Sequence, residues 1–235
     1  MPNVQLITLD LDNTLWDVDR VIIAAEKEMR AWLEQNVAKS LAIYESDVLP
    51  EIRQDVMATY ANQVHDLSFM RTQVLVEVMR RAGLGQQAAI DAAQQAFEVF
   101  YAGRNRVILF PGALEMLADL SRRFQLYALT NGNADIHRAG IGHFFAGGFS
   151  SAEVGQKKPH ADMFNAPLHK LGLQADQGIH IGDHLTDDIE GASAVGMHSI
   201  WVNLNGIQAK QNILPSQEVT HLNEIMHAVA KITDV

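Results

Sequence analysis

The sequence predicts an α/β protein: a parallel β-sheet with helices on both faces, interrupted by an all-helical insertion. Three observations lead to this prediction. An apolar run at residues 4–9 is typical of a strand buried in a parallel sheet. Residues 16–106 show only helical periodicity, and from residue 113 onward strand-like and helix-like segments alternate. The first strand therefore belongs with the later ones, and the helical segment is an insertion.

The insertion carries four apolar stripes at helical spacing, and Gly83 and Gly103 are expected to end the last two helices. The stripes lie at residues 21–33, 52–60, 74–78 and 90–100. With no strand among them, they indicate a small helical bundle. We expect a sheet-containing core domain at residues 1–15 and 106–235 and a helical cap domain at residues 16–105. Because the insertion leaves the sheet beside its polar strand ends, a lid is the natural role.

After Pro111-Gly112 the alternation predicts the remaining elements of the sheet and its helices. Expected strands lie at residues 125–130, 148–150, 178–181 and 198–202, with a short one near residue 219. Expected helices lie at residues 113–123, from the end of the second strand to about 139, at 160–171, at 187–195 and at 222–232.

Composition narrows the classes of function. The chain has 235 residues and a formal net charge of −10, which argues against nucleic acid polymers and anionic membranes as main partners. It contains no cysteine, which excludes disulfides, thiolate catalysis and cysteine-ligated metals. No apolar run approaches membrane-spanning length and no leader is evident at Met1, so a cytoplasmic protein is expected.

Two aspartates follow the first expected strand. Asp10 stands at its carboxyl end and Asp12 lies in the loop beyond. In open parallel sheets, these strand ends form the crevice where ligands bind. At ~4 Å and an effective dielectric constant of ~20, two carboxylates repel by about 4 kcal/mol. A shared proton, a cation or exposure to solvent must offset that repulsion, so the pair is either a polar turn or a site of chemistry.

Three further polar clusters stand at later strand ends or before a helix. They are Thr-Asn-Gly at 130–132, Lys-Lys-Pro at 157–159 and the segment 182–188, which includes Asp183 and Asp188. Taken singly, each is compatible with an ordinary turn or a solvated surface. Together, at successive strand ends, they predict one crevice lined by carboxylates, a lysine and neutral donors.

These clusters, in this order, resemble the four motifs of the haloacid dehalogenase (HAD) superfamily. The motifs are Asp10-Leu11-Asp12-Asn13-Thr14-Leu15, Thr130-Asn131-Gly132, Lys158-Pro159, and Gly182-Asp183 with Asp188. The resemblance covers essentially the whole chain, and the insertion between the first two motifs is similar to the helical cap of subfamily I. It implies a Rossmann-like core with a helical cap.

Within the superfamily, two stretches look like a bacterial group, the YigB-type phosphatases of flavin mononucleotide (FMN) and the riboflavin pathway. They are Thr-Asn-Gly-Asn-Ala at 130–134 and His-Asp-Leu-Ser at 65–68 with Arg71. The resemblance implies a Mg²⁺-dependent phosphatase of small phosphomonoesters. FMN and nucleotide monophosphates lead the expected substrates, followed by sugar phosphates and phosphoglycolate.

The resemblance also implies roles for the two aspartates of the first motif. Asp10 would attack phosphorus and form an aspartyl-phosphate, which divides hydrolysis into two easier displacements. Asp12 would protonate the leaving alcohol and then activate water. Dehalogenases of the superfamily lack this second acid, so Asp12 favours phosphoester chemistry.

The remaining motif residues would bind the metal and the phosphoryl group. Oxygen ligands suit Mg²⁺: the carboxylates of Asp10 and Asp183 and the backbone carbonyl of Asp12. Asp188 would support a metal-bound water or orient Lys158, and is a candidate ligand itself. The Thr130 hydroxyl and the Asn131–Gly132 turn would bind phosphoryl oxygens, while Lys158 balances charge.

Three residues outside these roles are candidates with alternatives. Trp16 either stacks on a flat substrate ring or packs at the hinge of the helical domain. Arg71 either binds a substrate anion or forms a surface ion pair. His184, beside Asp183, is a candidate contact to metal or substrate.

Other functions remain as alternatives. A phospho-accepting, receiver-like signalling domain also uses a parallel sheet, an acidic pocket, Mg²⁺, a Thr and a Lys, but the insertion and Asp12 count against it. Asp12 also counts against a dehalogenase, and a phosphonatase would need a cap lysine in a Schiff-base setting. A non-catalytic protein is disfavoured because every expected catalytic position is filled. The expected partner is a small phosphate ester, and the sequence does not indicate an oligomeric state.

Overall fold

The computed structural model describes residues 3–208 and 214–233, and the chain divides into two compact units. One unit comprises Met1–Asp17 and Ile108–Val235, and the other comprises Val18–Val107. We call them the core unit and the helical unit. The sequence placed the junctions after residues 15 and 105, whereas the units change after residues 17 and 107.

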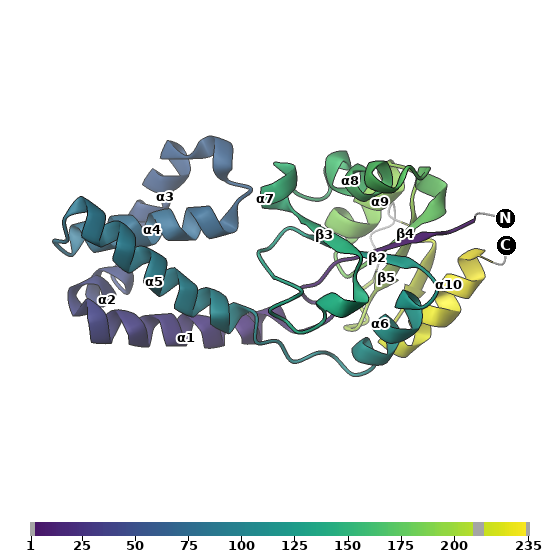
Figure 1. Ribbon diagram of the computed structural model, residues 1–235, viewed down its shortest axis with the longest axis horizontal. Coiled ribbons are helices and arrows are strands. Elements are labelled where there is room, and N and C mark those ends of the chain that lie inside the picture. The colour runs from purple at the N-terminus through teal and green to yellow at the C-terminus, as the bar shows by residue number, and fades with distance from the viewer. Residues whose placement is uncertain (1–2, 209–213, 234–235) are drawn as a thin grey trace. The chain divides into compact units, whose positions relative to one another are not determined.

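The core unit is built on a six-stranded parallel sheet in the order β3-β2-β1-β4-β5-β6 (Figure 1). The strands are β1 (Leu6–Leu9), β2 (Gln125–Thr130), β3 (Gly147–Ser150), β4 (Gly178–Gly182), β5 (His198–Val202) and β6 (Gln217–Val219). All residues of β1 are buried, as expected for a central strand covered on both faces. The predicted α/β class with a parallel sheet is confirmed.

Helices cover the sheet on both faces (Figure 1). They are α6 (Ala113–Ser121), α7 (Ser151–Val154), α8 (Ala161–Leu171), α9 (Gly191–Ala194) and α10 (Ile225–Thr233). On one face Phe164 and Leu168 of α8 and Ala192 of α9 pack with Leu6 and Leu129 of the sheet. The crossovers between parallel strands thus bury the apolar face of each helix, which fixes the strand ends in space.

Two helix predictions in the core unit need correction. The segment after β2 forms turns rather than a helix to residue 139, because Asp135 closes a single turn by accepting from the N–H groups of His137 and Arg138. Gly140, at a φ of 81°, then ends that turn. The helix expected at 187–195 begins earlier, as a π-helical turn at Leu185–Glu190, and continues as α9.

The helical unit contains one helix more than the four stripes predicted. Its α-helices are α1 (Val18–Asn36), α2 (Ala38–Tyr44), α3 (Leu49–Thr59), α4 (Leu67–Arg81) and α5 (Gln86–Arg104). The additional helix is α2, which spans only about two turns and buries only Ser40 and Tyr44, so it leaves no long apolar stripe in the sequence. Helix α5 continues one residue past Gly103, and the missing side chain of Gly103 lets α5 pack close to Ala25 of α1. No helix in the described part of the chain has the length and apolar character of a membrane span.

Candidate active site

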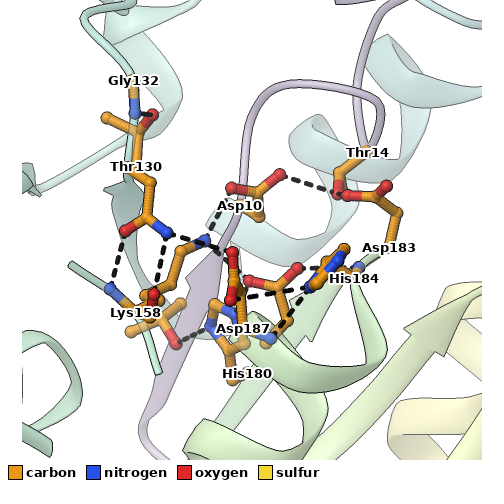
Figure 2. A network of polar contacts seen from close by, with 12 residues as sticks. Asp10, Thr14, Thr130, Gly132, Lys158, His180, Asp183, His184 and Asp187 are labelled. Carbon is orange, nitrogen blue, oxygen red and sulfur yellow. Dashed lines mark hydrogen bonds and ion pairs between the residues drawn. The ribbon is translucent and has the colours of Figure 1, made fainter. Parts of the chain in front are cut away.

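Parallel register brings the polar strand ends together at one edge of the sheet. Leu9, the last residue of β1, pairs with Ala128 of β2 and Ile181 of β4. Asp10, Thr130 and Asp183 therefore follow or end three adjacent strands, and Figure 2 shows them in one polar network. The side chains of Asp10, Asp183, Asp188 and Lys158 lie close together there.

Lys158 links two of the carboxylates. Its ammonium Nζ lies 2.6 Å from Asp10 Oδ1 and 2.6 Å from Asp188 Oδ1. All three residues are buried, with Lys158 only 3% exposed. The Thr14 hydroxyl spans the other side of the cluster, 3.1 Å from Asp10 Oδ2 and 3.2 Å from Asp183 Oδ1. The lysine and the threonine thus fix the relative positions of Asp10, Asp183 and Asp188.

Backbone geometry at β4 makes room for Asp188. A Cβ at Gly182 would collide with the Asp188 carboxyl group, so glycine is required there. The Asp188 carboxylate also accepts from the His184 backbone N–H at 2.9 Å, while the His184 ring is largely exposed and points to Asp187. His184 therefore contributes its backbone to the cluster.

Burial and mutual repulsion set the charges of the site. Burial raises the pKa of Asp10 to about 8; Lys158 opposes the rise, and Asp188 and Asp183 reinforce it. Burial, followed by the charge of Asp188, raises the pKa of Asp183 to about 6. Burial also acts against ionised Asp188, but Lys158 and His180 outweigh it and hold the pKa of Asp188 well below its usual range. Burial opposes charged Lys158 too, but Asp10 and Asp188 outweigh it and raise the lysine pKa.

A divalent cation fits this arrangement. Oxygen atoms of Asp10, Asp183 and Asp188 all lie within 4.8 Å of one another. Three carboxylates share one ammonium, and the charge of Asp188 adds to burial in raising the pKa values of Asp10 and Asp183. Hard oxygen donors with excess negative charge are the ligand set that Mg²⁺ prefers. A bound ion would make the ionised forms of these carboxylates favourable.

This charge balance predicts a metal-dependent pH profile of stability. A carboxylate whose pKa is raised by folding stabilises the fold at low pH and loses that contribution as pH rises through the folded value. In EDTA, the ionisation of Asp183 and Asp10 should therefore lower Tm by several degrees as the pH rises from about 4 to about 8. A loss of about 1 kcal/mol in the free energy of unfolding lowers Tm by about 2–4 °C in a chain of this size. Thermal melts with and without Mg²⁺ check this, and Mg²⁺ should raise Tm more at pH 8 than at pH 5.

The variant Asp183→Asn isolates the contribution of the site from that of other titrating groups. It should be more stable than the wild type at pH 8 in EDTA, because it removes a repelling carboxylate, and it should gain less from Mg²⁺. Parallel pH profiles for wild type and variant would contradict the assigned charges.

The second motif forms a turn that is attached to the lysine loop. The Asn131 side chain accepts from the Lys158 backbone N–H at 2.7 Å and donates to the Lys158 carbonyl at 3.0 Å. The Thr130 hydroxyl accepts from the Gly132 N–H at 2.9 Å, and Thr130 is 4% exposed. Asn131 therefore holds the Lys158 backbone with its side chain, a contact that its expected phosphate-binding role did not anticipate.

The remaining candidates, Asp12, Trp16 and Arg71, lie in different parts of the chain: the first two in the core unit and Arg71 in the helical unit. Asp12 is partly exposed and accepts a hydrogen bond from the Trp16 indole, while the Trp16 side chain is fully buried. Arg71 belongs to the helical unit, where it forms an ion pair with Glu26 and its guanidinium lies 3.7 Å from the centre of the Phe100 ring. The contacts described for Trp16 and Arg71 are thus within their own units, and their substrate contacts stay predictions.

Sequence reasoning missed a buried chain of polar residues beneath the site. His180, in the middle of β4, lies 3.0 Å from Asp188 Oδ1 through Nε2 and 2.8 Å from the Thr8 hydroxyl through Nδ1. Burial lowers the pKa of His180, so the ring is neutral. Ionised Asp188 can only accept, which places the ring proton on Nε2 and makes Nδ1 the acceptor from Thr8. The available signal was a pair of polar residues in two fully buried strands.

Replacing His180 is expected to destabilise the fold. His180→Ala removes a buried donor to Asp188 and the acceptor of the Thr8 hydroxyl, a loss of about 1–3 kcal/mol in the free energy of unfolding. The exposed His169, in the last turn of α8, provides a control, because His169→Ala should cost less than about 1 kcal/mol. Urea denaturation of both variants measures the difference, and equal midpoints would contradict a structural role for the buried chain.

A family model described as haloacid dehalogenase-like hydrolase matches residues 4–196. The chain belongs to this family. Among curated HAD-like relatives, 5-amino-6-(5-phospho-D-ribitylamino)uracil phosphatase YigB of Escherichia coli is 30% identical over 223 residues, which is 93% of each chain. The phosphoserine phosphatase of Thermus thermophilus is 31% identical over 166 residues, 68% of this chain and 65% of the relative.

A solved structure that is similar to this chain carries the name of a dehalogenase rather than a phosphatase. The crystal structure of a 2-haloacid dehalogenase from Pseudomonas syringae pv. Tomato superposes with a TM-score of 0.92 and 35% identity, over 97% of this chain and 99% of that one. The predicted membership in this superfamily and the predicted hydrolase class are therefore confirmed. The names of the curated relatives support a phosphatase. The name of the crystallised relative supports the alternative, a dehalogenase.

Proposed function

We propose that this HAD-like hydrolase is a Mg²⁺-dependent phosphatase of small phosphomonoesters that uses an aspartyl-phosphate intermediate. The observation that carries the proposal is the position of the two aspartates of the first motif. Asp10 is held by Lys158 and Thr14 within the carboxylate cluster, while Asp12 lies two residues further along the loop and its carboxylate accepts from the Trp16 indole. A nucleophile and a separate acid are the two groups that this hydrolysis needs.

Asp10 is suited to attack phosphorus. Its Oδ1 is bonded to Lys158 and its Oδ2 to Thr14, so the carboxylate has a fixed orientation at the strand end. Attack breaks the bond between phosphorus and the leaving oxygen and forms an acyl phosphate on Asp10. Asp12 gives its proton to the leaving oxygen and then accepts one from the water that releases phosphate.

The other residues of the cluster hold the phosphoryl group and balance its charge. The Lys158 ammonium, the Thr130 hydroxyl and the Asn131 backbone N–H would bind phosphoryl oxygens, while the Gly132 N–H donates to the Thr130 hydroxyl and orients it. When bound by Asp10, the Asp12 carbonyl and Asp183, with Asp188 nearby, Mg²⁺ would neutralise the excess negative charge and polarise the phosphoryl group. Because these groups are fixed before the substrate arrives, little reorganisation is needed during the reaction.

The second candidate function is 2-haloacid dehalogenation. It is favoured by one observation, the name of the crystallised relative with 35% identity. In that chemistry Asp10 would attack carbon and release a halide ion, and no acid would be needed for the leaving group. The presence of Asp12 and the phosphatase names of the curated relatives place this function second.

The substrate class follows from the relatives rather than from the core site. We propose that the helical unit acts as the cap that selects substrates, and that phosphate esters of ribityl or ribosyl compounds, such as the substrate named for YigB, FMN and nucleotide monophosphates, come before smaller esters. Phosphoserine and sugar phosphates form the next group to test.

A product-release screen tests the proposal. The purified protein is incubated with the phosphate esters above and with 2-chloropropionate, in Mg²⁺ or in EDTA, and released phosphate, released chloride and phosphorylation of the protein are measured. Phosphate release that needs Mg²⁺ is the expected result. Chloride release without phosphate release would establish the dehalogenase, and stable phosphorylation without turnover would establish the receiver-like alternative.

A further inference from the structure

The loop between Asp10 and Asp17 contains a hydrogen bond between the side chains of Trp16 and Asp12, to which the proposed mechanism assigns no role. The Trp16 indole N–H donates to Asp12 Oδ1 at 2.8 Å. The Trp16 side chain is 0% exposed, so a large rigid ring is enclosed by the protein while its polar edge reaches the carboxylate of the proposed acid. If the indole ring only filled apolar space, its N–H would not need to point toward Asp12.

The loop is closed by its own backbone, which fixes the distance between the two residues. The Leu15 N–H donates to the Leu11 carbonyl and the Asn13 N–H donates to the Trp16 carbonyl, each at 2.8 Å. Asn13 has a φ of 60°, the left-handed conformation that reverses the chain. Leu15 also accepts from the Phe110 N–H at 2.8 Å, which anchors the loop to the chain that returns to the core unit.

We propose that Trp16 is a positioning residue for Asp12, and this inference rests on the proposed phosphatase function. The indole N–H is a donor only, so it fixes one carboxylate oxygen and thereby sets the direction of the other. A carboxylate that must face the leaving oxygen in one step and the attacking water in the next benefits from a single orientation, because proton transfer requires hydrogen-bond geometry in both steps. Trp16 does not touch the reacting atoms and acts through Asp12.

The dependence of rate on leaving group distinguishes positioning from packing. An alkyl phosphate, such as a nucleoside monophosphate, needs its leaving oxygen protonated, whereas 4-nitrophenyl phosphate expels a stable anion and needs little help. Trp16→Phe keeps an aromatic ring and removes the N–H. In single-turnover experiments it should slow alkyl leaving-group release about 10- to 100-fold and nitrophenolate release less than about 3-fold. With 4-nitrophenyl phosphate the phosphoenzyme should then accumulate, because its formation is little affected while Asp12 is still needed for its hydrolysis.

Two further variants make the test specific. Trp32→Phe is the matched control, because Trp32 packs against the core of the helical unit, and it should leave the ratio of the two rates unchanged. In an Asp12→Asn background, Trp16→Phe should have little additional effect on alkyl leaving-group release, since both changes disable the same group. If Trp16→Phe folds poorly, replacing Trp16 by β-(3-benzothienyl)alanine keeps the bicyclic shape and removes only the N–H.

The outcomes separate the two proposals. Equal slowing of both substrates, or no slowing of either, would overturn the role of Trp16 while leaving the phosphatase function in place. Absence of phosphate release by the wild type from both substrates would refute the phosphatase function and, with it, the role of Trp16. Selective slowing in the folded Trp16 variant, absent in Trp32→Phe, is the supporting result.

Discussion

Replacing Asp10 by asparagine is expected to lower phosphate release by at least about 10⁴-fold, because the variant lacks the carboxylate that attacks phosphorus. The asparagine side chain has nearly the same shape, and its amide oxygen can still accept from Lys158, whose Nζ lies 2.6 Å from Asp10 Oδ1 in the wild type. The fold should therefore be kept. Steady-state phosphate release and thermal melting, measured on the same preparation, check both parts.

A matched substitution controls for the change of charge. Asp176 is an exposed aspartate of the core unit, and Asp176→Asn should retain wild-type turnover. Acid-quenched wild-type enzyme should carry one phosphoryl group, which peptide mass spectrometry would locate on Asp10, and Asp10→Asn should carry none. Substantial turnover by Asp10→Asn, or a phosphoryl group on another residue, would overturn the nucleophile assignment.

Replacing Asp12 by asparagine is expected to lower turnover of alkyl phosphates by about 10²- to 10⁴-fold, the usual contribution of general acid–base catalysis. In the wild type the Trp16 indole nitrogen lies 2.8 Å from Asp12 Oδ1, and the amide oxygen of the variant can still accept this hydrogen bond. The loop should therefore keep its shape, while the side chain at position 12 can no longer give or take a proton. With 4-nitrophenyl phosphate the first step should survive and the second should not. The phosphoenzyme should accumulate in a burst that rapid-quench experiments measure.

The size of this effect also decides between the remaining functions. A dehalogenase would not need Asp12 as an acid, so unchanged chloride release from a haloacid by Asp12→Asn would favour that chemistry. An alkyl phosphatase rate equal to that of the wild type would remove the acid/base role from Asp12 and would also leave Trp16 without a function to support.

The sequence predicted the elements of the core unit well where the pattern was long or strongly apolar. Residues 125–130 and 198–202 were predicted as strands and match β2 and β5, and the inserted helices were recognised as one group. It failed where local hydrogen bonds decide the structure. The turn closed by Asp135 contains residues that suit a helix, and the choice depends on its side chain accepting from two backbone N–H groups.

The amino-acid order alone was enough to indicate which residues meet at the strand ends, because parallel strands that alternate with helices leave their carboxyl ends at one edge of the sheet. What those residues do to one another became visible only in the folded chain. The contacts of Lys158 with Asp10 and Asp188, the support of Asp188 by His180, and the bond from Trp16 to Asp12 depend on side-chain directions and burial. Order along the chain fixes the neighbourhood of a residue, whereas charge and hydrogen-bond partners are set by packing across strands that are distant in the sequence.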